Sequence, residues 1–357
     1  MAGFETTEAV TAADLSRYDA IIDVRSPAEF ALDHLPGAEN LPVLDDQERA
    51  QVGTIYVQES RFLARRIGAA HVARNIARHL ETALADRPAS FRPLIYCWRG
   101  GQRSEAMATI LSQVGWPVTL LRGGYRTYRR HVTTRLYDTP RDLKLLLIDG
   151  HTGSAKTEVL HALSALGVQI LDLEGLAEHR GSLFGALAGR PQPSQKLFET
   201  RLLQTLDALD PERPIVVEAE ASKIGDRMTP PVLWRAMQLA PRVVLEASQE
   251  SRARYLVGAY GDIAADPDAL EAAFDRLPVA PSRERREVWR KLIAAGEFAE
   301  LAQALIDLHY DRAYDRAARK AEAPVLARMA VNPGEAESRA SAAQAIADAV
   351  LARYGAL

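Results

Sequence analysis

The sequence predicts an α/β fold made of two strand–helix units in series, followed by a helical C-terminal part. Short apolar runs alternate with longer segments of helical spacing, and this alternation is typical of a parallel, doubly wound sheet. Two of the apolar runs end in Gly-containing loops that open helices, which is where such sheets bind their ligands. From these patterns we expect domains at residues 1–137, 138–250 and 251–357.

The first unit opens with the apolar run Tyr18–Arg25, which predicts a short buried strand. A helix start follows, with Pro27 at the first helical position and Glu29 in the first turn. The other elements expected here are a helical stretch at about 56–85, a strand at 93–96, a helix at 103–114 and a strand at 117–121.

The second unit begins with a buried strand at 143–149 and a helix at 156–166 that stops at Gly167. Further strands are expected at 168–173, 214–218 and 242–246. Beyond about Ser251 the chain is rich in Ala, Arg and Glu and carries few strand signals, so we expect it to be helical.

The composition excludes a wholly basic nucleic-acid coat. The 44 Lys and Arg against 47 Asp and Glu give a formal net charge of −3, which leaves room for a local basic patch. One cysteine cannot form an internal disulfide, and this favours a reducing compartment. Met1–Ala20 lacks a signal-peptide pattern and no apolar run is long enough to span a membrane, so we expect a cytoplasmic protein without a membrane partner.

The single cysteine, Cys97, lies in a context that favours reactivity. It ends an apolar run, and Trp98-Arg99-Gly100-Gly101-Gln102-Arg103-Ser104 leads from it into a helical pattern. Such a loop turns backbone N–H groups toward the sulfur, and the helix N-terminus with Arg99 and Arg103 favours the thiolate. A thiolate can attack, and can carry a further sulfur or selenium atom. A buried inert cysteine is the alternative, but such a cysteine is not usually followed by Arg, Gly, Gly and Arg.

The stretch 126–144 reads as a linker rich in arginine, with tyrosines interleaved. A charge run is as often a solvated face as a binding site. Arginine with tyrosine is also the combination that binds phosphates and stacks on bases in single-stranded RNA. We therefore predict that Arg126, Arg129 and Arg130 bind RNA.

The segment Gly150-His151-Thr152-Gly153-Ser154-Ala155-Lys156-Thr157 joins a predicted strand to a predicted helix, as a phosphate-binding P-loop does. The pattern fits, except that Ala155 stands in place of the second glycine. Backbone N–H groups and the helix N-terminus would cradle a phosphate chain. The alternative is an ordinary Gly-rich turn. The residues predicted to bind the phosphates are Gly150, Gly153, Ser154, Lys156 and Thr157.

Acidic pairs follow two of the predicted strands, Asp172 with Glu174 and Glu218 with Glu220. Either pair could hold magnesium beside a phosphate, because ligands lie outside the carboxyl ends of parallel strands. Helix capping and surface charge are the alternative. The predicted magnesium ligands are Thr157, Asp172 and Glu218.

Two stretches, 178–185 and 193–199, mix basic, small and aromatic residues without an amphipathic period. That composition suits a substrate loop better than a core helix. The candidate substrate-binding residues are His179, Arg180, Ser182, Gln195 and Lys196.

The first unit resembles a rhodanese domain, a module that holds sulfur as a cysteine persulfide. The matching segments are 23–30, 34–38 and 97–104. Joined to a P-loop unit, the chain resembles the tRNA 2-selenouridine synthase family across nearly its whole length. The segments that carry this resemblance are 96–101, 150–157, 171–177, 179–182, 192–196 and 217–220.

The resemblance implies replacement of sulfur by selenium in 2-thiouridine at the tRNA wobble position, with selenophosphate as donor. It also implies an S-geranyl-2-thiouridine intermediate, made from geranyl diphosphate bound at the P-loop. Cys97 would carry selenium as a selenosulfide or assist departure of geranylthiol, and Arg99 and Arg103 would attract the anionic donor. The implied partners are tRNA and the enzyme that supplies selenophosphate, and no tightly bound organic cofactor is expected.

Two other functions stay open on the sequence alone. One is a rhodanese-type sulfurtransferase coupled to an NTP-dependent P-loop domain, which tRNA-stimulated nucleotide hydrolysis would favour. The other is an RNA-binding regulator with a relic rhodanese fold. A relic is expected to lose its cysteine, whereas this chain has Cys97.

Overall fold

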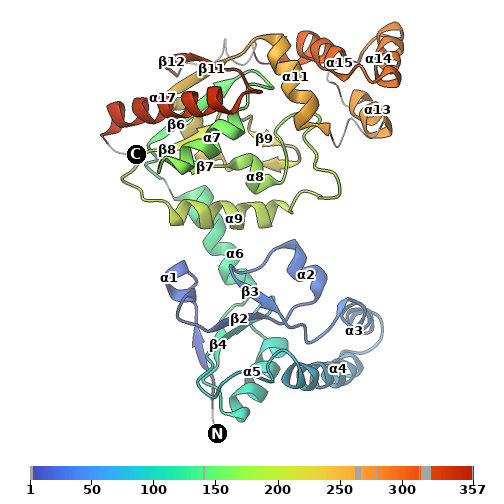
Figure 1. Cartoon of the computed structure of the whole chain (residues 1–357). Helices are drawn as coiled ribbons and strands as arrows, with labels where there is room; N and C mark the ends of the chain where they lie inside the picture. Colours follow the sequence, from blue (N-terminus) through green and yellow to red (C-terminus); the bar gives the residue numbers. More distant parts are fainter. Residues whose placement is uncertain are drawn as a thin grey trace. The chain divides into compact units, whose positions relative to one another are not determined.

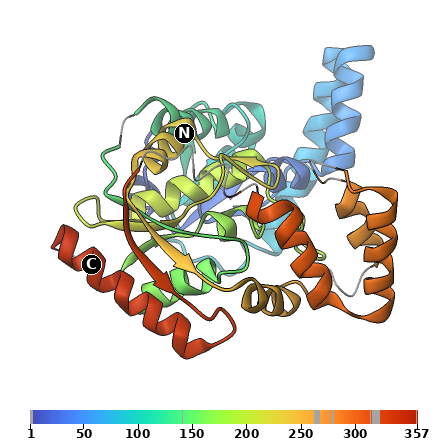
Figure 2. The same cartoon turned by 90° about the horizontal axis from the view of Figure 1, so that it is seen from above.

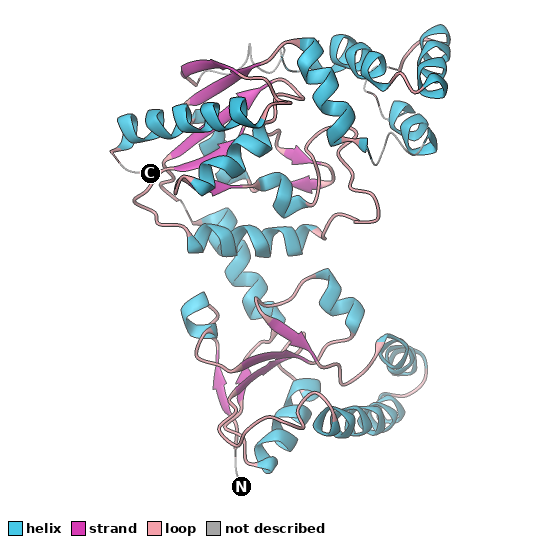
Figure 3. Ribbon diagram, in the orientation of Figure 1, coloured by secondary structure: helices cyan, strands magenta, loops and turns pink. Residues whose placement is uncertain are grey.

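The computed structural model describes residues 3–139, 141–261, 267–275, 277, 280–312, 314, 323–355 and 357. The chain divides into two compact units, Met1–Thr139 with Glu199–Asp207, and Pro140–Phe198 with Ala208–Leu357. Each unit has its own five-stranded sheet with helices around it (Figures 1 and 3). The predicted α/β class is therefore confirmed. Among the described helices, none is both long and apolar enough to cross a membrane.

The sheet of the first unit is parallel throughout, in the order β1-β5-β4-β2-β3. The strands are β1 (Glu5–Thr7), β2 (Ala20–Asp23), β3 (Ala38–Asn40), β4 (Pro93–Tyr96) and β5 (Thr119–Leu121). The middle strand β4 is buried at every position and leads directly to Cys97. Its bounds are the predicted ones.

The helices of the first unit include a capping box at Ser26 and Glu29, as expected for a helix that starts at Pro27. They are α1 (Ala12–Leu15), α2 (Pro27–Leu32), α3 (Asp46–Gln58), α4 (Arg61–Glu81), α5 (Gln102–Val114), α6 (Tyr125–Thr133) and the π-helix η1 (Thr134–Asp138). Helices α3 and α4 lie side by side as a pair (Figure 2). Ile22, Ile95 and Met107 lie in the core shared by the sheet and α5.

The stretch after β5 is helical rather than a linker over 126–138, so this part of the sequence interpretation was wrong. Tyr125, Tyr128 and Val132 are buried at spacings of three and four residues, which is the apolar stripe of a helix. The arginines occupy other positions of the helix. Because they are so frequent, the sequence interpretation gave them more weight than the apolar stripe, which only three residues form.

The sheet of the second unit is also parallel, in the order β12-β11-β6-β8-β7. Its strands are β6 (Leu145–Gly150), β7 (Gln169–Leu171), β8 (Ile215–Glu218), β11 (Arg242–Glu246) and β12 (Val325–Ala330), and a separate antiparallel hairpin is formed by β9 (Lys223–Ile224) and β10 (Arg227–Met228). The middle strand β6 ends at the P-loop, and β7 and β8 end at the two acidic pairs.

Helix α17 packs against α7 and shares a core with the sheet, which includes Leu160, Val216 and Ile346. The helices and the second π-helix of this unit are α7 (Lys156–Ala165), α8 (Leu173–Ala177), α10 (Pro231–Leu239), α11 (Gln249–Ala259), α13 (Pro267–Asp275), α14 (Arg283–Ala295), α15 (Phe298–Leu305), η2 (Ile306–Tyr310) and α17 (Ala336–Tyr354). Helix α9 (Gln195–Ala208) has its middle, Glu199–Asp207, in the first unit and its ends in the second. Phe274 and Trp289 centre a further apolar cluster on α13, α14 and α15.

The expectation of helices beyond Ser251 omitted β12, which pairs in parallel with β11 at the edge of the sheet. The side chains of β12 are exposed or half-buried and include Arg328. An edge strand of this kind lacks the buried apolar run by which the other strands were predicted.

Candidate active sites

The Cys97 loop directs two hydrogen-bond donors at the sulfur. The N–H of Gly101 lies 3.4 Å from Sγ and the Ser104 hydroxyl 3.1 Å from it. Gly101 is also the N-cap of α5, so the sulfur lies at the positive end of that helix. Cys97 is 4% exposed and Ser104 is buried. Donors and a helix N-terminus are surroundings of the kind that the prediction of a reactive cysteine requires, and the reactivity itself stays a prediction.

The loop holds this shape because it packs closely against the turn after β5. A Cβ on Gly124 would lie 2.2 Å from the carbonyl oxygen of Cys97, and one on Gly100 would lie 2.7 Å from that of Leu121. The N–H of Tyr125 donates to the Cys97 carbonyl at 2.8 Å. Both glycines have positive φ, so their backbone conformation also favours glycine.

A buried ion pair packs against Tyr125, the residue that follows this turn. The guanidinium of Arg25 binds the Asp23 carboxylate at 2.6 Å and lies 4.2 Å from the centre of the Tyr125 ring. The Tyr125 hydroxyl in turn donates to Asp33 at 2.7 Å. These residues fix the start of α6 and do not approach the sulfur as ligands, so we assign them a structural role.

The two arginines predicted to attract an anionic donor differ in their surroundings. Arg103 binds Glu29 at 2.7 Å. Burial, the largest single effect, opposes ionisation of Glu29, but the hydrogen bond and charge of Arg103, together with the Ser26 N–H and Arg49, lower the pKa of the carboxyl. Arg99 is exposed and forms no ion pair with the residues that the structure describes. Arg99 is thus the more accessible of these two arginines.

The arginines predicted to bind RNA lie on α6. Arg126 and Arg130 are exposed, as a phosphate contact requires. Arg129 is only partly exposed and forms an ion pair with Glu199, whose carboxylate also accepts from the Tyr137 hydroxyl at 2.7 Å. Because Arg129 is held by its ion pair with Glu199, Arg126 and Arg130 are better placed than Arg129 to contact RNA phosphates.

The P-loop has the expected position between β6 and α7. Gly150 and Gly153 have positive φ, and a Cβ on Gly150 would lie 2.8 Å from the carbonyl oxygen of Leu245. Lys156 Nζ donates to the Gly150 carbonyl at 3.0 Å. The Ser154 hydroxyl is buried and has no hydrogen-bond partner among the described residues. A buried polar atom left unpaired is costly, and a bound phosphate oxygen would satisfy it.

Arg252 supports this loop from α11, and the sequence reasoning missed it. Its guanidinium donates to the Thr152 carbonyl at 3.1 Å and pairs with Asp311 at 2.8 Å. Arg252 is 2% exposed. Arg252 lies in a segment that was predicted to be helical, but the sequence does not show that its side chain is buried, so no sequence signal identified it. The segment after Ser251 therefore takes part in shaping the P-loop.

Ala155, the departure from the P-loop pattern, has a left-handed backbone with φ of 58°. This conformation costs an L-residue roughly 1–2 kcal/mol, whereas glycine adopts it freely. We expect Ala155→Gly to raise the free energy of unfolding by about 0.5–1 kcal/mol, after the greater freedom of unfolded glycine is subtracted. Chemical denaturation measures this change.

Ala162→Gly in the interior of α7 is the matched control, and it should lower the free energy of unfolding by about 1 kcal/mol. A loss of stability in both variants would contradict the strain assigned to Ala155.

The carboxylates of Glu174, Glu218 and Glu220 lie within 4.8 Å of one another at the ends of β7 and β8. Burial, together with the neighbouring carboxylates, raises the pKa of both Glu174 and Glu218. Oε1 of Glu218 is buried without a hydrogen-bond partner among the described residues, and the Thr157 hydroxyl lies 3.4 Å from Glu174. Hard oxygen donors beside a phosphate cradle fit Mg²⁺.

Asp172, predicted as a magnesium ligand, is engaged elsewhere. Its carboxylate accepts from the N–H of Gly175 at 2.7 Å as the N-cap of α8, and pairs with His161 at 2.8 Å. Glu174, two residues on, reaches the cluster in its place. The predicted Thr157 and Glu218 do lie at the cluster.

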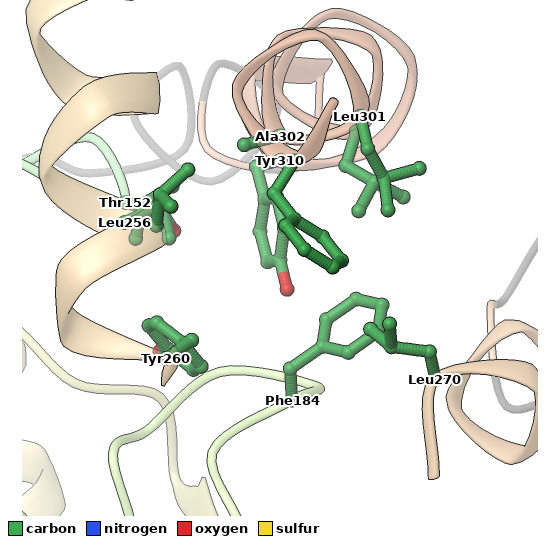
Figure 4. A pocket seen from close by; sticks show the side chains of 11 residues that line it. Thr152, Phe184, Leu256, Tyr260, Leu270, Leu301, Ala302 and Tyr310 are labelled. Carbon is green, nitrogen blue, oxygen red and sulfur yellow. The ribbon is translucent and has the colours of Figure 1, made fainter. Parts of the chain in front are cut away.

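An apolar pocket borders the P-loop. Thr152 of the loop and Leu256 of α11 lie on one side of it, and Leu301 of α15 lies on another (Figure 4). The remaining lining residues are mostly apolar or aromatic: Phe184, Val257, Tyr260, Leu270, Phe298, Ala302, Leu305 and Tyr310. No single sequence segment forms this pocket, which is why the sequence did not predict it. The pocket, about 80 Å³ in volume, is thus an apolar space next to the P-loop.

The candidate substrate residues are distributed over several settings. His179 and Ser182 line a second, polar pocket, while the Arg180 guanidinium lies 5.0 Å from the centre of the Tyr260 ring. The amide of Gln195 both donates to and accepts from the backbone of Met228 at 2.8 Å, so its role is structural. Lys196 is exposed in the first turn of α9.

Comparisons with known proteins identify both units. A model of the rhodanese-like domain matches residues 7–131, and a model described as the tRNA 2-selenouridine synthase AAA domain matches residues 143–272. The tRNA 2-selenouridine synthase of Nitrosomonas eutropha is 32% identical over 80% of this chain and 74% of its own length. That of Alcanivorax borkumensis is 34% identical over 75% and 76%.

The tRNA 2-selenouridine synthase of Nitrosomonas europaea is 37% identical over 62% of this chain and 61% of its own length. The chain thus spans a little under two thirds of the length of this relative.

Proposed function

Because this chain belongs to the tRNA 2-selenouridine synthase family, we propose that it replaces the sulfur of wobble 2-thiouridine in tRNA by selenium from selenophosphate in the cytoplasm. The reaction passes through S-geranyl-2-thiouridine, made from geranyl diphosphate. The observation that carries this proposal is the apolar pocket at the edge of the P-loop. A diphosphate with a hydrocarbon chain needs both surfaces at once, whereas a nucleotide base needs several polar partners, of which this lining offers only the hydroxyls of Thr152, Tyr260 and Tyr310.

In the first step, the 2-thiouridine sulfur attacks C1 of geranyl diphosphate. The C1–O bond breaks, diphosphate leaves with the bonding electrons, and the N3 proton of the base is released. The P-loop N–H groups and the Lys156 ammonium stabilise the negative charge on the leaving group. Thr157, Glu174 and Glu218 would hold Mg²⁺, which supplies further neutralisation of the diphosphate when bound.

In the second step, the selenium of selenophosphate attacks C2 of the alkylated base, the C2–S bond breaks, and the sulfur leaves as geranylthiol after taking up a proton. Water then cleaves the Se–P bond, which releases phosphate and leaves 2-selenouridine. Alkylation makes departure of the sulfur possible, because a thiocarbonyl sulfur is a poor leaving group and a thiolate is a better one. Cys97 acts in this step, and the exposed Arg99 attracts the anionic donor. Arg126 and Arg130 contact tRNA phosphates, and an enzyme that makes selenophosphate supplies the donor.

Nucleoside analysis by mass spectrometry tests the proposal. Incubation of tRNA that contains 2-thiouridine with the protein and geranyl diphosphate should give S-geranyl-2-thiouridine, and selenophosphate should then give 2-selenouridine. Selenation that needs ATP hydrolysis and proceeds without geranyl diphosphate would favour an NTP-dependent sulfurtransferase or selenotransferase instead.

We expect Ala302→Phe to weaken binding of geranyl diphosphate about tenfold or more. Ala302 lines the apolar pocket, and a phenyl ring there would displace at least two methylene groups of the chain, each worth about 0.8 kcal/mol. Inorganic diphosphate, which has no chain, should bind unchanged. Titration calorimetry measures both ligands. Ala299→Phe, at an exposed position of the same helix, should leave both affinities unaltered, and equal effects of the two variants would contradict the pocket assignment.

A further inference from the structure

A polar cavity of about 880 Å³ lies beside the P-loop site and is used by none of the steps above. Its walls are the loop 179–192 and the hairpin of β9 and β10. The volume is in the range of small-molecule sites, roughly 300–1,000 Å³. A cavity of this size is large enough to bind part of a large substrate.

The walls of the polar cavity are held together by one amide side chain. Gln192 donates to the carbonyls of Ala177 and Ile224, at 2.9 and 3.1 Å, and its Oε1 accepts from the N–H of Asp226 at 2.6 Å. The loop and the hairpin are therefore joined without a regular sheet between them. A wall fixed in this way presents its other side chains at constant positions.

Those other side chains carry positive charge. Arg190 and Lys223 are exposed at the cavity, and Arg227 is half-buried there, with its Nε left without a hydrogen-bond partner among the described residues. Asp226 is the single acidic residue of the lining. Its ion pair with Lys223, at 3.4 Å, is exposed and contributes little. The balance favours an anionic occupant with polar edges.

The cavity adjoins both parts of the P-loop site through the short segment 181–184. Gly181 lines the cavity, and a Cβ there would lie 2.0 Å from Glu174 and 2.7 Å from Glu220. Gly181 has positive φ, so glycine is required at this close approach. Phe184, three residues on, lines the apolar pocket. One segment therefore separates the polar cavity from the apolar pocket and touches the acidic cluster.

We infer that the polar cavity binds the acceptor nucleotide, an unpaired uridine of the RNA together with its flanking phosphates. This inference rests on the proposed function. The base lies in the cavity beside the segment 181–184, Arg190 and Arg227 bind the phosphates, and the hydrocarbon chain lies on the other side of that segment. A base must leave its stack before chemistry can reach its sulfur, and a polar cavity with cationic walls accepts it in that state.

Binding of an anticodon stem-loop RNA that contains 2-thiouridine, followed by fluorescence anisotropy over a series of salt concentrations, tests the inference. Arg190→Ala and Arg227→Ala should each weaken binding and reduce the slope of log K against log salt by about 0.7. Ala186→Trp, which fills the cavity from an exposed lining position, should weaken binding without altering the slope. All three should bind inorganic diphosphate as the wild type does.

Arg235→Ala is the matched control, because Arg235 is an exposed arginine of the same unit outside the cavity lining. Wild-type RNA affinity and slope in the three cavity variants would overturn the inference, and a reduced slope in Arg126→Ala with Arg130→Ala would then assign the RNA surface to α6. Failure of the wild type to bind the RNA at all would instead overturn the proposed function.

Discussion

Lys156→Ala is expected to reduce the rate of geranyl transfer by at least about 100-fold, the effect of removing one donor that stabilises charge in a transition state. Lys156 Nζ donates to the carbonyl of Gly150, which holds the ammonium at the loop. There it would neutralise the negative charge on the leaving diphosphate, and alanine has no group that can do so.

Three measurements separate this effect from damage to the fold. The thermal midpoint of Lys156→Ala should fall by only the few degrees expected for the loss of one hydrogen bond worth about 1 kcal/mol, the bond to the carbonyl of the buried Gly150. Selenation of tRNA that already carries the geranyl group should survive. Lys144→Ala, at an exposed lysine paired with Glu212 in the same unit, should geranylate normally. Geranylation by Lys156→Ala within threefold of the wild type would place the diphosphate elsewhere.

Much of the fold follows from local pattern. Strands β4 and β11 have the predicted bounds because their apolar runs are fully or mostly buried, and the P-loop lies where strand, glycines and helix start coincide. The prediction failed in two places. Helix α6 does carry an apolar stripe, but the density of its arginines favoured the linker interpretation, whereas β12 is half-exposed at a sheet edge and lacks a buried apolar run.

The sites also differ in how far local sequence predicts them. The Cys97 loop and the P-loop are contiguous in sequence, and the resemblance to the rhodanese and tRNA 2-selenouridine synthase families is confirmed by both family models. The carboxylates of the predicted magnesium site were harder to identify, because each strand end is followed by two of them. The Asp172 carboxylate caps α8, and Glu174 lies in the acidic cluster instead. The apolar pocket joins Thr152 to residues more than a hundred positions away, and no local signal connects them.

Cys97→Ser is expected to abolish selenium incorporation, by roughly a thousandfold or more, while geranylation of 2-thiouridine continues. Serine fits the buried site and keeps the hydrogen bonds from Gly101 and Ser104, but its hydroxyl does not ionise near neutral pH as a thiol does. The proposed geranyl step would use the P-loop unit, which has its own sheet and core. Nucleoside analysis after geranyl diphosphate alone, and then after selenophosphate, separates the two steps in one sample.

Ser104→Ala tests whether the loop around Cys97 serves its chemistry or only its packing. The Ser104 hydroxyl lies 3.1 Å from Sγ and 3.1 Å from the Gly101 carbonyl oxygen, so its removal takes a polar partner from the sulfur and should slow selenation. Geranylation of 2-thiouridine by Ser104→Ala should stay at the wild-type rate. Equal selenation by Cys97→Ser and the wild type would remove Cys97 from the chemistry and leave the helix N-terminus of α5 without a reacting group.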